Sequence, residues 1–359
     1  MRSSSGSHFI ALDHIRAVAA FLVVSWHFLH STNGTPIEFG SVPFFGPLSF
    51  LNEGHTGVAV FMTLSGYLFA KLLDGRDFSF PSFLWNRTLR LLPLLSFVIL
   101  IVLIQKYFHG ESLQNFAISI VQGIFLPTLP NGGWSITVEF HFYLILPFLL
   151  YVLKTKPHAL SLAIISTIGI RAILYQFHGE VQSLAYWTIF GRIDQFIFGI
   201  LSFKYRRYIS GRNFIALLIF LFFTFALWYF NFCGGFYHFP AYPSSSPVWI
   251  FLPAIEGFSY GAIISWYDNS KYPKDGPLSN FWGRVGEYSY SIYLLHIFFV
   301  FSASSYINEI FGPINSIFIG CLWSVVFFLA MIPIAHVSYT YFEKPFLKHR
   351  KQYIQNYHN

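Results

Sequence analysis

The sequence predicts an all-α integral membrane protein with about ten transmembrane helices and with both termini in the cytoplasm. Of its 359 residues, 55% are hydrophobic and only 10% are charged, whereas soluble domains carry about 25% charged residues. Apolar runs long enough to cross a bilayer recur along the chain with no long polar segment between them. This composition excludes a soluble globular enzyme and favours one polytopic membrane domain.

Ten apolar windows are long enough to cross the membrane as short or tilted helices. They cover residues 11–30, 56–73, 91–108, 134–153, 158–176, 186–203, 213–231, 248–267, 287–306 and 314–338. Helix-breaking residues separate several of them, as at Pro127 and Pro130 before Trp134.

Basic residues set the expected orientation, because loops rich in lysine and arginine stay in the cytoplasm. With ten spans, all of the 22 lysines and arginines except Lys106, Arg171 and Arg192 lie on one side or at helix ends that face it. That side is expected to be the cytoplasm, and an even number of spans places both termini there. The expected regions are a short polar cytoplasmic N-terminus (1–10), a polytopic membrane domain (11–342) and a basic cytoplasmic tail (343–359).

The formal charge of +7 does not indicate a nucleic-acid partner, because the basic residues are scattered over short loops and form no stripe. The two cysteines, Cys233 and Cys321, have no metal-like or redox-like neighbours in the sequence. We therefore predict no metal site and no bound cofactor. The first apolar stretch has no small-residue cleavage site, so we expect it to remain in the mature protein.

Two ionisable residues, Arg16 and His27, lie in the first predicted span. A charged group at bilayer depth costs at least about 2.5 kcal/mol, so such residues indicate a functional site. At about 100° per residue, His27 returns to within roughly 20° of Arg16 and lies about 16 Å further along the helix. One helix face is therefore expected to carry a cation near its start and an imidazole near mid-membrane.

This opening stretch resembles the first span of the membrane acyltransferase-3 family. It contains Leu12, Asp13 and Arg16, followed by an apolar run that ends at His27, with the Arg–His spacing typical of the family. Four further segments resemble family motifs in the same order along the chain. They are 57–67, 87–90 followed by Pro93, 134–143, and 288–296 together with 343–345.

The chain departs from the family pattern at four positions. His14 stands where the family usually has glycine, and Ala59 where it often has aspartate. Phe140 replaces a second carboxylate and His141 replaces a glutamine. Any role of the family's second-span aspartate is therefore not carried over. We expect a stand-alone form without the soluble C-terminal domain of longer relatives.

The resemblance implies a catalytic set of His27, Arg16 and Glu139. Imidazole titrates near neutrality, so His27 can take a proton from an acceptor hydroxyl and return it. Guanidinium stays protonated, so Arg16 is expected to grip the donor or orient the site, supported by Asp13 three residues earlier. Two plainer interpretations stay open: a histidine that only stiffens the bundle, and an arginine that snorkels to the headgroups.

Arg87 and Arg90 are expected to bind the donor together with Arg16. Their i, i+3 spacing lets one helical face, at the cytoplasmic mouth of the third span, present two guanidinium forks to phosphate oxygens. Coenzyme A carries several phosphates. Positive-inside anchoring is the alternative for either arginine.

Four side chains are predicted to bind the acceptor or support the site: Asp13, Trp134, Asp194 and His296. Glu139 lies in the fourth span, where an isolated carboxylate is costly, and is expected to pair with an arginine or bind the acceptor. Trp134 is expected to anchor its helix at the interface or stack on a sugar. Asp194 is expected to form an internal ion pair with Arg192, and His296 to be a second polar group near mid-membrane.

The resemblance implies a membrane O-acyltransferase that moves an acyl group, expected to be acetyl, from cytoplasmic acetyl-CoA to a hydroxyl. The expected acceptor is a cell-surface or lipid-linked glycan such as O-antigen, exopolysaccharide or capsule, and the expected location is a bacterial inner membrane. Direct transfer and an acyl-enzyme both stay open, as do a homo-oligomer and a complex with glycan-assembly proteins. The alternative is a transporter or flippase whose intramembrane ionisable groups form a substrate pathway.

Overall fold

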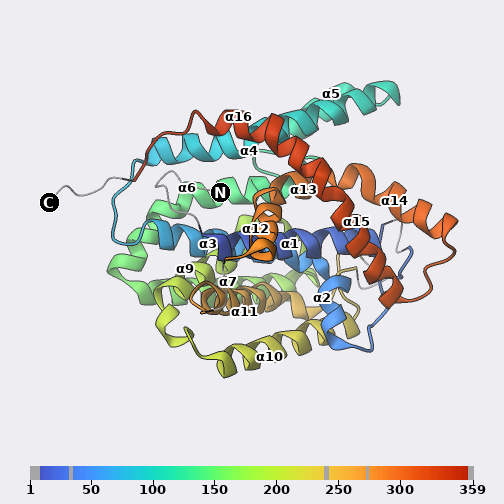
Figure 1. The fold of residues 1–359 in the computed structure, drawn as a ribbon. Coiled ribbons are helices and arrows are strands. Elements are labelled where there is room, and N and C mark those ends of the chain that lie inside the picture. Colours follow the sequence, from blue (N-terminus) through green and yellow to red (C-terminus); the bar gives the residue numbers. More distant parts are fainter. Residues whose placement is uncertain (1–8, 32–34, 238–241, 272–274, 355–359) are drawn as a thin grey trace.

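The computed structural model describes residues 9–31, 35–237, 242–271 and 275–354, and its helices form one bundle (Figure 1). Over these residues the regular structure is helical, with one isolated antiparallel bridge between Phe78 and Ile354. Each predicted window falls on a helix or on a bent pair of helices. The predicted all-α membrane fold is confirmed.

Among the described residues, six helices are long and apolar enough to cross a membrane. They are α1 (Ile10–Leu29), α4 (Phe80–Phe108), α6 (Trp134–Thr155), α7 (Pro157–His178), α10 (Asn213–Phe232) and α15 (Ile317–Ser338), whose apolar stretch continues to Leu347. A seventh crossing is formed if the bent pair α13 (Ser289–Leu295) and α14 (Ile297–Ile310) is one span. Ten spans and two cytoplasmic termini stay predictions.

Three of the predicted spans are shorter helices that form an inner layer. They are α3 (Gly57–Leu72), α9 (Ile189–Lys204) and α11 (Leu252–Asp268), with 16, 16 and 17 residues. A Cβ on Gly66 would lie 2.1 Å from the carbonyl oxygen of Phe196, and one on Gly199 would lie 2.0 Å from that of Thr63. Glycine therefore lets α3 and α9 pack backbone against backbone, as in many membrane proteins.

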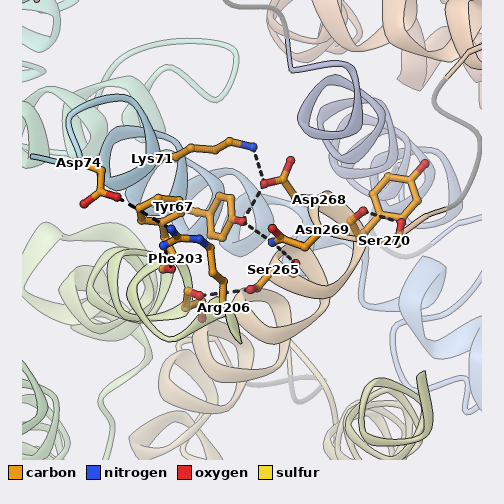
Figure 2. Close-up of polar contacts among 11 residues, drawn as sticks. Tyr67, Lys71, Asp74, Phe203, Arg206, Ser265, Asp268, Asn269 and Ser270 are labelled. Carbon is orange, nitrogen blue, oxygen red and sulfur yellow. Dashed lines mark hydrogen bonds and ion pairs between the residues drawn. The ribbon is translucent and has the colours of Figure 1, made fainter. Parts of the chain in front are cut away.

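Polar side chains tie the ends of α3 and α11 together (Figure 2). The Tyr67 hydroxyl donates to Oδ2 of Asp268 at 2.8 Å, and Nζ of Lys71 lies 2.5 Å from the same oxygen. Asn269 donates from Nδ2 to the Tyr67 hydroxyl at 3.2 Å. These contacts fix α3, which also lines the candidate site described below.

Helix α1 lies in the middle of the bundle (Figure 1). Its span window is 72% buried, against 17–39% for the other five long apolar helices. Its neighbours include α3, α15, α13 and α12 (Pro277–Glu287). Ala17, Ala19 and Ala20 are fully buried, because small side chains let surrounding helices approach closely. Helix α1, which carries the candidate site residues Arg16 and His27, is thus shielded from lipid over most of its surface.

Helix α4 begins at Phe80, well before the predicted window that starts at residue 91. Pro81 in its first turn suits a helix start, whereas the polar residues around Arg87 hide this part of the helix from a hydropathy window. Arg87 and Arg90 therefore lie within a continuous helix that begins before the predicted span, and their position at the cytoplasmic mouth of that span stays a prediction. The helix also continues through Pro93.

The predicted span 287–306 is a broken helix. Helices α13 and α14 meet at an angle of 66°, and His296 is the residue between them. The remaining short elements connect the long helices. They are α2 (Ser49–Asn52), α5 (Leu113–Gln122), α8 (Gln182–Trp187), α16 (Lys344–Leu347), a π-helical turn (Tyr339–Glu343) and the 3₁₀ turns Gly46–Leu48, Gly54–Thr56, Arg206–Tyr208 and Pro247–Ile250.

Candidate functional site

Two cavities share Val58 and Tyr293 in their walls. The first has a volume of about 160 Å³ and is called the arginine cavity, because its lining includes Arg16, Arg87, Arg90 and Arg350. The second has a volume of about 140 Å³ and is called the aromatic cavity. Its lining includes Trp26, Trp134, Tyr186, Trp187, Phe236, Tyr237 and the imidazoles of His27, His55 and His296.

The residues selected from the sequence divide between these two cavities. The arginine cavity is lined by Asp13, Arg16, Arg87, Arg90 and Glu139. The aromatic cavity is lined by Trp134, His27 and His296. Asp194 is fully buried outside both linings. Arg16 and His27 therefore share a helix but open onto different cavities.

Two of the cavity's arginines are held by carboxylates. Arg16 forms an ion pair with Asp13 on the same helix, as the i, i+3 spacing allows. Arg90 forms an ion pair with Glu343 from the π-helical turn. Ser291 donates to the other oxygen of Glu343 at 2.6 Å. The buried Glu343 is thus fully engaged, and the guanidinium of Arg90 is fixed by it.

Arg87 is held mainly by aromatic rings. Its guanidinium carbon lies 5.1 Å from the ring centroid of Phe69 and 5.5 Å from that of Phe83, within the range of cation–π attraction. Its Nε is buried and has no hydrogen-bond partner in the part of the chain that the structure describes. Arg87 therefore keeps an Nε donor that is not used within the described protein.

Glu139 receives hydrogen bonds from hydroxyl groups. Tyr143, one turn later on α6, donates to Oε1, and Ser65 of α3 donates to the same oxygen at 3.1 Å. The ion pairs found among the described residues do not include Glu139. The carboxyl group thus lines the arginine cavity with two hydroxyl donors on Oε1.

His27 and His296 meet in the aromatic cavity. Their ring centroids are 4.9 Å apart, and Nε2 of His296 lies 3.2 Å from Nδ1 of His27. Nδ1 of His27 also lies 2.9 Å from the carbonyl oxygen of Val23, and Nδ1 of His296 lies 3.1 Å from that of Ile292. The break between α13 and α14 places His296 beside the first helix.

These contacts assign the tautomers of a neutral pair. A carbonyl oxygen accepts only, so Nδ1 of each ring carries the proton. The Nδ1–H of His27 is then shared between two acceptors, Nε2 of His296 and the carbonyl oxygen of Val23. This leaves the lone pair of His27 on Nε2, the atom from which a general base would act.

Trp134 lies in a wall of aromatic rings, and the guanidinium of Arg192 packs against two of these rings. Its ring lies 5.0 Å from Tyr186 and 4.6 Å from Trp187, measured between centroids. The guanidinium carbon of Arg192 lies 4.3 Å from the ring centroid of Tyr186 and 5.4 Å from that of Trp134. Gln195 accepts from Nη1 of Arg192 at 3.0 Å. The wall is therefore held from the protein side by a buried charge.

The expected ion pair between Asp194 and Arg192 is wrong. Asp194 accepts from Nη2 of Arg171 on α7 at 2.6 Å. Residues two apart on a helix point in different directions, so Arg192 faces the aromatic wall while Asp194 faces α7. Arg171 is fully buried and also donates to the carbonyl oxygens of Ile250 and Gly191. Asp194 joins helices and does not face either cavity.

The carboxylate of Glu53, in a connecting segment, supports two rings of the aromatic cavity. Glu53 accepts from Nδ2 of Asn231 at 2.7 Å and from the backbone N–H of Phe236 at 3.2 Å. Burial raises the pKa of the Glu53 carboxyl to about 7, against the opposing effects of His30 and these hydrogen bonds. Glu53 thereby positions the segment that supplies Phe236 and Tyr237.

Sequence reasoning missed several cavity residues. Tyr186 and Tyr237 carry no spacing signal, and tyrosines of this kind are expected in interfacial belts. His55 is given little weight by the sequence because it is expected near an interface, yet it lines the aromatic cavity. Arg350 was included only in the positive charge of the expected cytoplasmic side. Tyr293 lies within the family-like segment 288–296, which was the one available signal for a residue that lines both cavities.

The comparison with protein families decides the class. The model of the acyltransferase domain, Acyl_transf_3, matches residues 9–335. The chain belongs to the membrane acyltransferase-3 family. This match covers α1 to nearly the end of α15, so the lining of both cavities lies within the matched range except for Arg350.

Two curated proteins resemble this acyltransferase-3 member over about half of its length. The peptidoglycan O-acetyltransferase OatA of Listeria monocytogenes is 27% identical over 192 residues, which are 46% of this chain and 28% of OatA. The putative peptidoglycan O-acetyltransferase YrhL of Bacillus subtilis is 25% identical over 209 residues, which are 49% of this chain and 30% of YrhL. The match thus spans less than a third of either relative. No solved structure matches the chain.

Proposed function

We propose that this acyltransferase-3 member moves an acyl group, expected to be acetyl, from cytoplasmic acyl-CoA to a hydroxyl of a cell-surface or lipid-linked glycan. The two relatives are named as peptidoglycan O-acetyltransferases, which supports an O-acetyl transfer to a glycan. We also propose a bacterial inner membrane location with both termini in the cytoplasm, as the distribution of basic residues predicts.

The observation that carries the proposal is the pair of neighbouring cavities. One is lined by four arginines and the other by aromatic rings and a histidine pair, and Val58 and Tyr293 belong to both walls. A phosphorylated donor and a sugar acceptor need these two different surfaces. The shared wall is the place where a thioester from one cavity would meet a hydroxyl from the other.

On the donor side, guanidinium groups suit phosphate oxygens because their N–H groups match them in geometry and charge. Arg87, with its unused Nε donor, is proposed to bind the donor directly. Arg90 and Arg16 are proposed to contribute positive charge while their carboxylate partners hold them in place.

On the acceptor side, the faces of Trp134 and Trp187 offer flat apolar surfaces for a sugar ring. Nε2 of His27 would take the hydroxyl proton as the oxygen attacks the thioester carbonyl carbon. The C–S bond then breaks, and the protonated imidazole returns the proton to the leaving thiolate. His296 and Val23 would accept from Nδ1–H throughout, which stabilises the imidazolium.

The test is acyl transfer by the purified full-length protein in proteoliposomes, with radiolabelled acetyl-CoA and a lipid-linked glycan. We expect His27→Ala to lower the transfer rate at least about 100-fold, the contribution of a general base, and to leave CoA binding unchanged. His158→Ala is the matched control, because this histidine is exposed on α7. Full transfer by His27→Ala would refute the mechanism.

The same preparation tests the transporter alternative. A flippase for a glycolipid needs no acyl-CoA. Translocation of the glycan by protein that binds no CoA would therefore replace the proposed function.

A further inference from the structure

The last described residues, 349–354, form a strap that returns along α4. The backbone N–H of Ser79 donates to the carbonyl oxygen of Tyr353 at 2.8 Å, and Phe78 bridges to Ile354. Tyr353 is 1% exposed and packs against Phe83, with 5.6 Å between the ring centroids. The strap is therefore part of the packed structure at the start of α4.

Two side chains of α4 hold the strap on both sides of Arg350. Asn86 donates from Nδ2 to the carbonyl oxygen of Lys351 at 2.7 Å and accepts from its backbone N–H at 2.8 Å. Trp85 donates from Nε1 to the carbonyl oxygen of His349 at 3.2 Å. Because Asn86 is fully buried, its two bonds are shielded from competing water. The backbone of Arg350 is thus fixed beside the turns that carry Arg87 and Arg90.

Arg350 brings a further positive charge into a crowded wall of the arginine cavity. Burial, together with the charges of Arg87 and Arg90, lowers the pKa of Arg350 to about 10. The three guanidinium groups still remain protonated at neutral pH. Like charges held close together are unfavourable. Glu343, which pairs with Arg90 and also interacts with Arg350, compensates part of this positive charge, and a phosphate group would compensate the remainder.

We propose that the strap completes the donor site and that Arg350 binds a phosphate group of acyl-CoA together with Arg87. Asn86 is the positioning residue that places Arg350. Guanidinium forks from two separate chain segments can hold one phosphate from two directions. The role is binding alone, with no bond made or broken at Arg350. The inference rests on the proposed use of acyl-CoA.

The experiment measures binding of CoA and of pantetheine to full-length protein in nanodiscs of zwitterionic lipid. Pantetheine carries the thiol arm of CoA without its phosphates. We expect Arg350→Gln to weaken CoA binding about tenfold, the loss of one charge-assisted contact, and to leave pantetheine binding unchanged. Asn86→Ala should weaken CoA binding in the same selective way although every arginine is retained. Lys348→Gln, which removes an exposed charge from the same tail, should have no effect.

The outcomes separate the two proposals. If the unmodified protein binds no CoA, the proposed function fails, and the inference fails with it. If the unmodified protein binds CoA but Arg350→Gln binds it equally well, or loses CoA and pantetheine alike, only the inference is overturned.

An anionic lipid headgroup offers the same phosphate chemistry. A parallel measurement in nanodiscs with anionic lipid distinguishes it. If such lipid raises the melting temperature of the unmodified protein but not of Arg350→Gln, and the variant binds CoA normally, the strap binds lipid and the inference is wrong.

Discussion

The arginine cavity and the aromatic cavity share a wall but are built in opposite ways. The arginine cavity takes its charged groups from helices, apart from Arg350 in the strap, and holds two of them with carboxylates, as in the pair of Arg90 and Glu343. The aromatic cavity combines helix residues with residues of the connecting segments such as His55 and Phe236, and its polar groups are mostly imidazoles and the polar atoms of aromatic rings. Binding a charged donor requires fixed charges, whereas binding a sugar requires flat surfaces and one base.

Within the arginine cavity, charges that are held in an ion pair also differ from charges that remain available to a ligand. Within one cavity, Arg90 is neutralised by a buried carboxylate and Arg87 is not neutralised in that way. A buried ion pair is costly to break, but it offers less to an anionic ligand because the carboxylate already compensates the positive charge. We therefore expect substitutions in the two cavities, and at the two arginines, to act on different measured quantities.

The largest expected effect on stability comes from Glu343→Gln. It leaves the largely buried Arg90 without its counter-ion, and breaking such a pair costs about 3 to 5 kcal/mol. The measurement is chemical unfolding of the purified protein in detergent. Adding Arg90→Gln should recover part of the loss, because it removes the uncompensated charge. A single variant as stable as the unmodified protein would contradict a structural role for this pair.

The second effect concerns the donor. Arg87→Gln should raise KM for acyl-CoA about tenfold, since one charge-assisted contact is lost, with little change in the melting temperature. The KM for the glycan should not change, because Arg87 does not line the aromatic cavity. Equal changes in both KM values would mean that the two cavities do not divide the substrates.

The reciprocal effect concerns the acceptor. Trp187→Ala should raise the KM for the glycan about two- to tenfold, the range of one aromatic contact, without affecting the KM for acyl-CoA. Trp187→Phe is the control, because it keeps a ring but loses the hydrogen bond from Nε1 to the Tyr242 hydroxyl. A phenylalanine variant as impaired as the alanine variant would show that this hydrogen bond, and not the ring, matters.

A further expected effect is a change in pH dependence through Glu53. Its pKa is raised from 4.5 to about 7 in the folded protein, so its protonated form favours folding. This contribution is complete below about pH 4.5 and is lost as the pH rises through about 7. Melting temperatures of the unmodified protein should therefore fall between these pH values, and Glu53→Gln should flatten that decline. An unchanged profile would show that Glu53 does not titrate in this range.

The sequence predicted the helices well where they are apolar and less well where they carry residues of the candidate site. Every predicted window lies on helix, but the polar start of α4 was missed because Arg87 and its neighbours lower the local hydropathy. The break at His296 was missed for another reason: no proline or glycine marks it, and both halves are apolar. Hydropathy reports the average environment of a helix and not its straightness.

The partners of the site residues could be predicted only when they are close in sequence. Asp13 and Arg16 are three residues apart, and their ion pair was expected. The approach of His27 to His296 joins residues 269 positions apart, and the pairing of Asp194 with Arg171 depends on how α7 packs against α9. The roles assigned to the site residues stay predictions, because the structure gives their positions and not their chemistry.

The central position of α1 has a consequence for how the protein is made. This helix is synthesised before α12, α13 and α15, which pack against it and follow it by more than 240 residues. Before those helices are made, the ion pair between Asp13 and Arg16 can already form, since it lies within one helical turn. His27 can contact His296 only after α13 and α14 have been synthesised. The order of synthesis thus delays assembly of the histidine pair until the helices from α3 to α12 have been made.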